Sequence, residues 1–338
     1  MVVLGRSAAP SLTAARWALG RILVGVTPWA ILAGPAVVAL AATAKIEGPL
    51  PLVWAVSATP VVLLPAYPIL LTAIIRRRRA LFAVAAAVVA MHVALVAPSA
   101  GPFRGDPVAA DSAVDGSQAL RLLTANVFLG NDDIERSGTR ILSADADVVL
   151  LQEVTPAHLP GLQPLLAAYP YTFVQPDGGA LGFAVLSRYP MSEAKQEMLA
   201  GHPLVSVILD VAGRPLRVWD VHPPAPRDGG SRQVWARHLS ALAAAAETTG
   251  DPLVIAGDFN ATRWTSELGP LLSGRLVDAH EAVGRGLAAT WPANASVPPF
   301  LLLDHVLISQ ELSVTSVAEL PAGHSDHRPV VADLALRL

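Results

Sequence analysis

The sequence predicts an α/β protein in which two β-sheets pack face to face with helices outside, preceded by a membrane region of three helices. The first observation is that the N-terminal hundred residues contain three long apolar runs. The second is that many short β-like runs alternate with a few helical ones from Ala119 onward. The third is that only 15% of the 338 residues are charged, against roughly a quarter in a soluble domain. We therefore divide the chain into a membrane region at 1–100, a linker at 101–118 and a folded domain at 119–338.

Transmembrane helices are expected at about residues 22–44, 50–75 and 80–98. These runs carry no charged side chain other than His92 in its protonated form. Each is long enough to cross roughly 30 Å of hydrocarbon as a helix. The alternative is a set of buried helices in a large soluble core, which three such runs in succession disfavour. Prolines inside the first two runs are expected to kink these helices without breaking them, because neighbouring helices re-satisfy the freed carbonyls.

Basic residues flank the apolar runs unevenly, which predicts an orientation. One side holds Arg6, Arg16, Arg21 and the run Arg76–Arg79, whereas the other holds only Lys45 and Arg104. The positive-inside rule places the first side in the cytoplasm. Three crossings then deliver everything after Pro98 to the outside of the membrane. The linker is rich in Gly, Pro, Ala, Ser and Asp and predicts a tether.

Composition narrows the classes of function. The chain has no cysteine, which excludes disulfides, thiolate zinc sites and a cysteine nucleophile. From Gln118 to the end there are 15 basic against 23 acidic residues, a balance of −8. An acidic domain disfavours a polyanionic partner such as DNA, although metal ligands account for part of the negative charge.

Periodicity predicts each element of the folded domain in turn. The expected strands are Leu120–Val127, Val148–Val154, Tyr171–Val174, Ala180–Ser187, Leu204–Val211, Leu216–Val221, Leu253–Ala256, Asp304–Ile308 and Val330–Leu336. The expected helices are Asp132–Ser143, Pro156–Ala168 and Ser231–Thr248, the last with Ser231 as its N-cap. So many short strands in about 220 residues suit two packed sheets in a single domain.

Polar groups stand at the ends of these apolar runs. The segments are Thr124-Ala125-Asn126, Leu151-Gln152-Glu153, Asp220-Val221-His222, Gly257-Asp258-Phe259-Asn260, Leu303-Asp304-His305 and Ser325-Asp326-His327-Arg328-Pro329. Strand ends that converge at one edge of the sheets would bring these side chains together. Acids, amides and imidazoles in one place are the groups that phosphoester hydrolysis with a metal ion requires.

The carboxylates and amides are candidates for the metal and water sites. Glu153 offers a hard oxygen ligand for Mg²⁺, with a surface acid as the plain alternative. Asn126 and Asn260 are neutral, so they can orient metal ligands and phosphate oxygens without repelling them. Asp258 and Asn260 are two positions apart, so an extended segment directs both to one side. The alternative there is an Asp-x-Asn turn, while Asp326 is expected to complete the metal or water site.

The imidazoles are candidates for proton transfer. His327 is the candidate general base or electrostatic stabiliser, oriented by Asp304. His222 would protonate the leaving oxygen or brace the phosphate, and the sequence leaves open which histidine is base and which is acid. A polar loop before the final strand is the alternative for residues 325–327. His305 is expected on the face opposite Asp304, and His324 has no motif of its own.

These segments together resemble the endonuclease/exonuclease/phosphatase superfamily over about Leu120–Leu338. The order Asn, Glu, His, Asp-x-Asn, Asp, Asp-His is complete, and residues 182–188 resemble the family's central strand. The resemblance implies a four-layer α/β sandwich and a divalent metal, usually Mg²⁺ with Mn²⁺ as a possible substitute. It also implies that Asp258 positions or deprotonates the attacking water. The anchored arrangement, with the segment His222–Pro226, is similar to bacterial members associated with glycopeptide resistance and envelope functions.

These observations predict an outward-facing, Mg²⁺-dependent phosphoesterase in a bacterial plasma membrane. The expected substrate is a lipid-linked phosphate or pyrophosphate, or a phospholipid headgroup, because a short tether keeps the site close to lipids. An extracytoplasmic nuclease is the second hypothesis, disfavoured by the acidic domain. A receptor on an inactive hydrolase fold is the third, disfavoured because no motif residue is replaced. The oligomeric state and the number of metal ions stay open.

Overall fold

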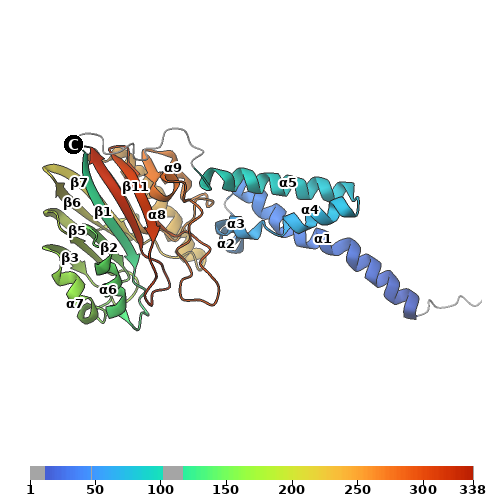
Figure 1. Cartoon of the computed structure of the whole chain (residues 1–338), viewed down its shortest axis with the longest axis horizontal. Coiled ribbons are helices and arrows are strands. Elements are labelled where there is room, and N and C mark those ends of the chain that lie inside the picture. The colour runs from blue at the N-terminus through green and yellow to red at the C-terminus, as the bar shows by residue number, and fades with distance from the viewer. Residues whose placement is uncertain (1–11, 47, 102–116, 338) are drawn as a thin grey trace, which may run out of the picture.

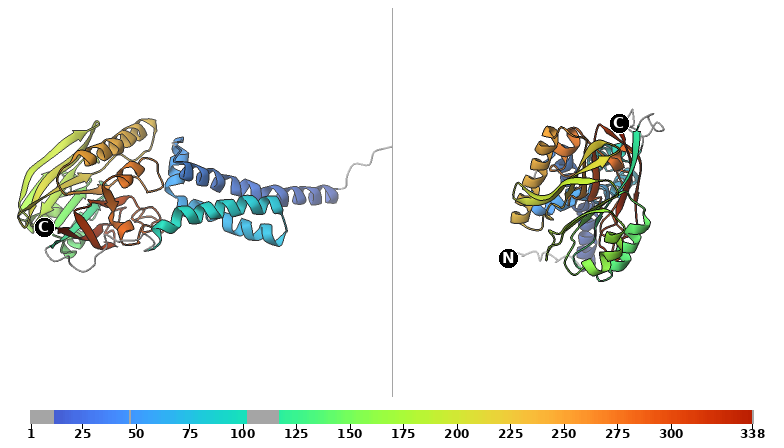
Figure 2. Two further views of the ribbon diagram at one scale, coloured as in Figure 1. Left: turned by 90° about the horizontal axis from the view of Figure 1, so that it is seen from above. Right: turned by 90° about the vertical axis from the view of Figure 1, so that its left-hand side faces the viewer.

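The structure is a computed structural model that describes residues 12–46, 48–101 and 117–337, with side chains from Val26 onward. Figure 1 shows two parts: a compact α/β domain and a long helical region that projects from one end of it. The same arrangement is visible from two further directions in Figure 2. The linker expected at 101–118 lies largely outside the described residues.

The α/β domain contains two six-stranded mixed sheets. In spatial order, the first sheet is β11 (Leu312–Glu319), β12 (Val330–Arg337), β1 (Ser117–Asn126), β2 (Val148–Gln152), β4 (Phe183–Ser187) and β3 (Tyr171–Gln175). The second is β5 (Met191–Leu199), β6 (His202–Val211), β7 (Arg214–Val221), β8 (Leu253–Asp258), β10 (Asp304–Ser309) and β9 (Leu276–Asp278). Each sheet has one parallel pair near its centre, β1 with β2 and β7 with β8.

The layers are held together by three apolar clusters. The inner faces of both sheets form one core that includes Leu150, Val207 and Val306. Helices α6 (Ile134–Ser143) and α7 (Leu159–Ala167) pack on the outer face of the first sheet. Helices α8 (Gly229–Thr248) and α9 (Gly269–Ser273) pack on the outer face of the second, with α10 (Ala279–Ala282) following β9. This confirms the predicted sandwich of two sheets between layers of helices.

Every strand and helix predicted for this domain is present, with shifted ends, but three strands and the two short helices α9 and α10 were missed. β5 is an edge strand whose side chains are largely exposed, so it has no buried alternation. β11 contains a bulge between Val314 and Ser316 that interrupts the two-residue period, and β9 has three residues. The N-cap of α8 was also placed wrongly: Asp228 caps it, and Ser231 completes a capping box.

The helical region consists of α1 (Leu12–Ala44), α2 (Leu50–Ser57), α3 (Thr59–Val62), α4 (Ala66–Ile75), α5 (Arg79–Val96) and the short helix η1 (Ala97–Ser99). Within the described residues, two helices are long and apolar enough to cross a membrane, Val26–Ala44 and Arg79–Ser99. The second expected helix differs from the kinked helix that was predicted. It divides at Ala58 into Leu50–Ser57 and Thr59–Ile75, which meet at 84°, so it is a broken span or a re-entrant segment. Pro60 and Pro65 lie at the breaks of this run, whereas α1 runs through Pro28 and Pro35.

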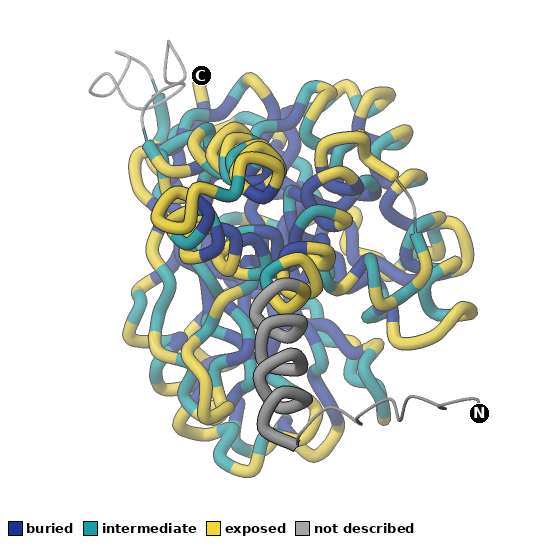
Figure 3. Tube along the Cα trace, turned by 90° about the vertical axis from the view of Figure 1, so that its right-hand side faces the viewer, coloured by how far each residue is buried: buried dark blue, intermediate teal, exposed yellow. Residues whose placement is uncertain are grey.

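The turns of the helical region from Val26 onward are largely exposed, while the buried segments gather in the middle of the view (Figure 3). Exposed apolar residues include Ile31, Leu71 and Phe82. A band of exposed apolar side chains around helices of this length is typical of contact with lipid.

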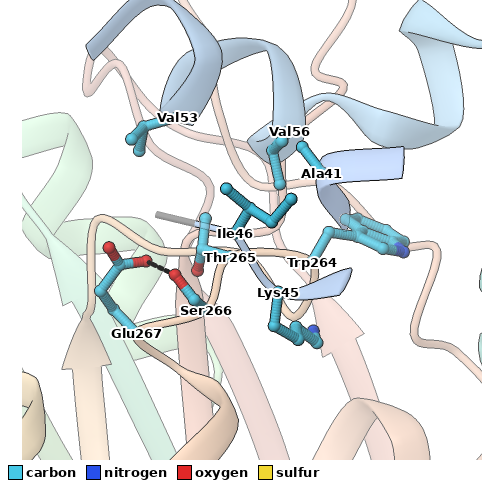
Figure 4. A pocket seen from close by; sticks show the side chains of 9 residues that line it. All are labelled: Ala41, Lys45, Ile46, Val53, Val56, Trp264, Thr265, Ser266 and Glu267. Carbon is cyan, nitrogen blue, oxygen red and sulfur yellow. Dashed lines mark hydrogen bonds between the residues drawn. The ribbon is translucent and has the colours of Figure 1, made fainter. Parts of the chain in front are cut away.

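Helix α2 and the bend at Ala58 that follows it contact the α/β domain. The hydrogen bonds across this junction include Trp54 Nε1 to Pro226 O at 2.9 Å, Thr262 Oγ1 to Ser57 O at 3.1 Å and Lys45 Nζ to Arg263 O at 3.3 Å. Arg263 also donates to Ser99 Oγ. The indole of Trp264 is buried against the helices, near Ala41 and Val56 (Figure 4). The α/β domain is therefore docked on the helices by direct contacts.

Candidate functional site

The parallel strand pairs bring the predicted site residues to one edge of the sandwich. β1 and β2 end together, as do β7 and β8, and Asp304 pairs with Asp258 across β10 and β8. Gly257 makes the close approach of β7 and β8 possible. Its φ is +146°, and a Cβ there would lie 1.9 Å from the carbonyl oxygen of Val221. Only glycine fits this position.

Asp258 lies at the centre of the site. Its Oδ2 atom is 3.1 Å from Asn126 Nδ2, 3.5 Å from His222 Nε2 and 3.4 Å from His327 Nε2. Its Oδ1 atom accepts a hydrogen bond of 2.8 Å from the backbone of Asn260. Burial opposes ionisation of this carboxyl, but the two histidines lower its pKa to about 2. Asp258 is therefore a carboxylate surrounded by donors.

Glu153 follows β2 with φ near +61° and faces the same space. Its Oε1 atom accepts from Asn126 Nδ2 at 3.1 Å, and its Oε2 atom accepts from the backbone of Leu129 at 2.7 Å. The amide oxygen of Asn126 is occupied by the backbone of Phe128 at 2.9 Å. Asn126 thus uses its NH₂ group to orient two carboxylates.

His327 is held by two carboxylates. Its Nδ1 atom lies 2.8 Å from Asp304 Oδ2, and its Nε2 atom faces Asp258. Burial alone would lower the pKa of this imidazole, but Asp304 and then Asp258 raise it to about 10. His327 is consequently an imidazolium in this arrangement.

His222 lies on the other side of Asp258. Its Nδ1 atom donates to Ala180 O at 2.9 Å, so Nε2 points toward Asp258 and Glu153. Burial lowers its pKa, but the two carboxylates outweigh burial and raise it. His202 fixes the backbone of this residue, because its Nε2 atom donates to the carbonyl of His222 at 2.6 Å.

Asp326 and Asn260 complete the predicted set. Asp326 accepts from Trp291 Nε1 at 3.3 Å, and burial raises its pKa with further contributions from Glu153 and Asp258. Asn260 Nδ2 donates to Pro223 O at 3.0 Å and so ties the loop after β8 to the loop after β7. The structure thus brings together all eight predicted residues: Asn126, Glu153, His222, Asp258, Asn260, Asp304, Asp326 and His327.

The donor set fits a divalent cation. The Oδ1 atoms of Asp304 and Asp326 are buried and accept no hydrogen bond from the described residues. The carboxylates of Glu153, Asp258 and Asp326 repel one another, and a bound cation would relieve that repulsion. Among the described residues, one group of three acid or imidazole side chains has ligand atoms within 4.8 Å of one another, namely Asp258, Asp304 and His327. The three side chains of that group are close because His327 contacts both carboxylates. The Oδ1 atoms of Asp304 and Asp326, which accept no hydrogen bond from the described residues, are the oxygens that suit a hard cation.

Several supporting residues were not predicted. Ser325 Oγ donates to Asn126 O and accepts from His327 N, and Thr290 Oγ1 accepts from the backbone of Asp304. Their signal in the sequence is weak, because Ser and Thr occur in many loops. Asp220, quoted only as part of a motif, is fully buried and accepts a 2.6 Å bond from Gln152 across the two sheets. Burial raises its pKa well above the ordinary value, which favours the neutral form of this carboxyl.

His305 and His324 lie outside the site. His305 points to the face opposite Asp304, as expected, and contacts Asp278 and the carbonyl of Ala261. His324 is half-exposed and contacts Asp132, away from the central carboxylates.

The fold has solved relatives in several organisms. One is an endonuclease/exonuclease/phosphatase from Beutenbergia cavernae, with a TM-score of 0.53 and 23% identity over 65% of this chain and 72% of that one. Another is D. rerio TDP2 complexed with a single-strand DNA product, with a TM-score of 0.54 and 20% identity over 64% and 98%. A third is a family protein from Bacteroides thetaiotaomicron, with a TM-score of 0.52 and 15% identity over 66% and 99%. These likenesses concern the fold.

The sequence gives the decisive match. No curated protein matches the chain. The model of the endonuclease/exonuclease/phosphatase family matches residues 123–327, which include every site residue described above. The chain therefore belongs to the endonuclease/exonuclease/phosphatase family, whose members are metal-dependent hydrolases of phosphoester bonds.

Proposed function

We propose that this protein is a membrane-anchored phosphoesterase that acts on a lipid-linked substrate with Mg²⁺, for which Mn²⁺ can substitute. The bond hydrolysed is a phosphodiester, phosphomonoester or pyrophosphate bond in a lipid carrier or a phospholipid headgroup. The protein is placed in a bacterial plasma membrane with the catalytic domain outside.

The observation that carries the proposal is that the active-site loops touch the membrane helices. The loop after His222 accepts a hydrogen bond from Trp54 through Pro226 O. The loop after Asp258 donates one from Thr262 to Ser57 O. Both loops begin at catalytic residues, so the edge of the sandwich that carries the site is also the edge that meets the bilayer. A substrate held in the membrane is therefore close to the catalytic groups without diffusing away from the surface.

The rim of the site is apolar, which favours a lipid over a nucleic acid. Leu129 is 46% exposed, and its backbone N–H donates to Glu153. Leu181 is 39% exposed and follows Ala180, the partner of His222. Phe300 is 38% exposed and packs on Trp291, the partner of Asp326. Exposed apolar side chains next to three catalytic groups suit a ligand with a hydrocarbon part.

The residues can be given roles. Glu153 and Asp326 would hold the metal, with Asn126 orienting Glu153, and the bound cation would neutralise charge on the phosphate oxygens. Asp258 is ionised and hydrogen-bonded, so it positions the attacking water and accepts its proton. The raised pKa of His327 favours an imidazolium that stabilises negative charge over a general base, with Asp304 holding its ring. His222 protonates the leaving oxygen, and Asn260 braces the phosphate.

The orientation rests on the distribution of arginines. Arg76–Arg79 form the turn between α4 and α5, which lies at the end of the helical region far from the α/β domain (Figure 1). The positive-inside rule assigns that end to the cytoplasm. The broken run then crosses as one bent span, with α2 lying at the outer surface. Reporter fusions after Arg79 and at Gly116 test this topology; the same compartment for both would overturn it.

The experiment for the function uses the full chain in detergent with a polyprenyl pyrophosphate and plasmid DNA as parallel substrates. Variants Glu153→Ala and His327→Ala remove a proposed metal ligand and the stabilising imidazolium. Glu193→Ala, on the exposed strand β5, is the matched control. Mg²⁺-dependent lipid hydrolysis that is lost in both site variants and kept in the control supports the proposal. Cleavage of DNA alone would establish the second candidate.

That second candidate is an extracytoplasmic nuclease. It is favoured by the likeness to D. rerio TDP2, a structure with a single-strand DNA product. The acidic balance of the domain and the apolar rim argue against it.

A further inference from the structure

A cationic pocket lies beside the catalytic site and takes no part in the roles described above. It has a volume of about 310 Å³ and is lined by Arg136, Arg140, Asn294, His324 and Ser325. The two arginines are four positions apart on α6, so they project from one face of the helix.

Arg140 has no carboxylate partner among the described residues. Its Nε atom is buried without a hydrogen-bond acceptor. A guanidinium is always charged, and burying it without a partner is costly. Three other partly buried arginines of the same domain are paired with carboxylates: Arg217 with Asp251, Arg263 with Glu281 and Arg275 with Glu311. Arg232 is the nearest parallel to Arg140, since its Nε atom is also buried without an acceptor, although its Nη2 atom lies 4.0 Å from Glu267. Arg140 therefore has the free donors that an incoming anion needs.

Arg136 is held toward the same pocket. His324 Nδ1 lies 3.1 Å from Asp132 Oδ1, and His324 Nε2 lies 3.4 Å from Arg136 Nη1. His324 Nε2 also lies 3.6 Å from Asp133 Oδ2, so the imidazole stands between the two acids and Arg136. Asp133 accepts from the backbone N–H of Arg136 as the N-cap of α6. The nearby acids therefore contact the imidazole and the helix end, and neither forms an ion pair with a guanidinium.

The wall between this pocket and the catalytic site is a single loop. Gly323 lets that loop lie against α6, since a Cβ there would be 3.2 Å from Arg140 Cδ. Ser325 lines the pocket, and its hydroxyl accepts from the backbone of His327. Ala293 also lines the pocket, and its backbone N–H donates to Asp326 O at 2.7 Å. The pocket and the scissile position are thus adjacent.

We propose that this pocket binds a second phosphate group of the substrate, separate from the phosphate that is hydrolysed. The proposal rests on the phosphoester hydrolysis described above and selects, within lipid substrates, those that carry two phosphates. A lipid is favoured over DNA because a strand needs a row of basic contacts, whereas this domain has two arginines here and a balance of −8.

The test compares substrates that differ by one phosphate, using the full chain in detergent with Mg²⁺. One pair is cardiolipin and phosphatidylglycerol, and the other is farnesyl pyrophosphate and farnesyl monophosphate. Arg140→Gln should lower kcat/KM for the two-phosphate member by about tenfold or more, mainly through KM, because a charge-assisted contact is lost. The one-phosphate member should be unaffected. Arg140→Lys should restore part of the preference, and Arg237→Gln, exposed on α8, should change neither rate.

Equal loss for both substrates, an effect on DNA cleavage, or equal binding of inorganic phosphate would each overturn the pocket proposal. An equal loss for both members of a pair would show that Arg140 is structural or acts on the scissile phosphate. Loss of DNA cleavage in place of lipid hydrolysis would assign the pocket to a nucleic acid. If the wild type hydrolyses no lipid, the proposed function fails, and the pocket is then tested by binding alone. Inorganic phosphate titrated in EDTA and followed by phosphorus NMR should bind the wild type and not Arg136→Gln/Arg140→Gln; equal binding refutes the pocket.

Discussion

Replacing Asp304 with asparagine isolates the contribution of one carboxylate to catalysis. Asp304 touches His327 at 2.8 Å, and Asp258 remains as a second carboxylate at 3.4 Å from the same ring. Breaking a buried ion pair costs about 3–5 kcal/mol, and with the second carboxylate in place we expect roughly half of this. About 2 kcal/mol of lost stabilisation corresponds to a fall in kcat of about thirty-fold.

The assay is kcat for phosphoester hydrolysis measured across a range of Mg²⁺ concentrations. If Asp304 acts by holding His327, kcat falls while the Mg²⁺ concentration for half-maximal rate stays unchanged. If Asp304 is a metal ligand, extra Mg²⁺ restores the rate. Asp145→Asn, at an exposed ion pair with Arg188, is the control. A kcat for Asp304→Asn within about threefold of the wild type at saturating Mg²⁺ would refute the reasoning.

Three further changes test the electrostatics and the backbone. Folding raises the pKa of Asp220 and so favours its neutral form, which means that the free energy of unfolding falls as pH rises above 3.8, the pKa of this group in the unfolded chain. Asp220→Asn should remove this loss and give a higher unfolding midpoint at pH 8. His280 is buried, which disfavours its charge, but Asp278 and Glu319 raise its pKa to about 9, so it stabilises the fold below pH 6.5 and this contribution disappears as pH rises to 9. His280→Gln should therefore flatten the fall of the unfolding midpoint between pH 6.5 and 9, and an unchanged slope would contradict the assignment. Gly257→Ala should abolish folding or activity, because its Cβ would collide with Val221 O, and a well-folded active variant would show that β8 can shift.

The site was predictable because its residues occupy strand ends. Asn126, Glu153, His222 and Asp258 follow apolar runs directly, and parallel pairing then brings them together. Short apolar runs likewise revealed the central strands β2, β4 and β8, in which every residue is buried.

The parts that escaped prediction depend on contacts distant in sequence. Nothing near Ser325 indicates that its hydroxyl joins Asn126 to His327, because those partners meet only after both sheets have formed. The break at Ala58 was missed because the run continues through Ser57 and Thr59 without a charged residue. Composition shows that a run is apolar, but it does not show where the helix axis bends, as it does here near Pro60 and Pro65.

The docking of Trp264 into the helices has a practical consequence for work on this enzyme. A water-soluble fragment that starts at Ser117 would leave the indole without its apolar neighbours, and Thr262 and Pro226 without their hydrogen-bond partners. Such a fragment would expose an apolar surface, which favours aggregation, next to the loops that follow His222 and Asp258. Kinetic constants, inhibitor screens and crystals obtained from it would describe a molecule in which the border of the candidate site is altered, so the intact chain is the proper object of study.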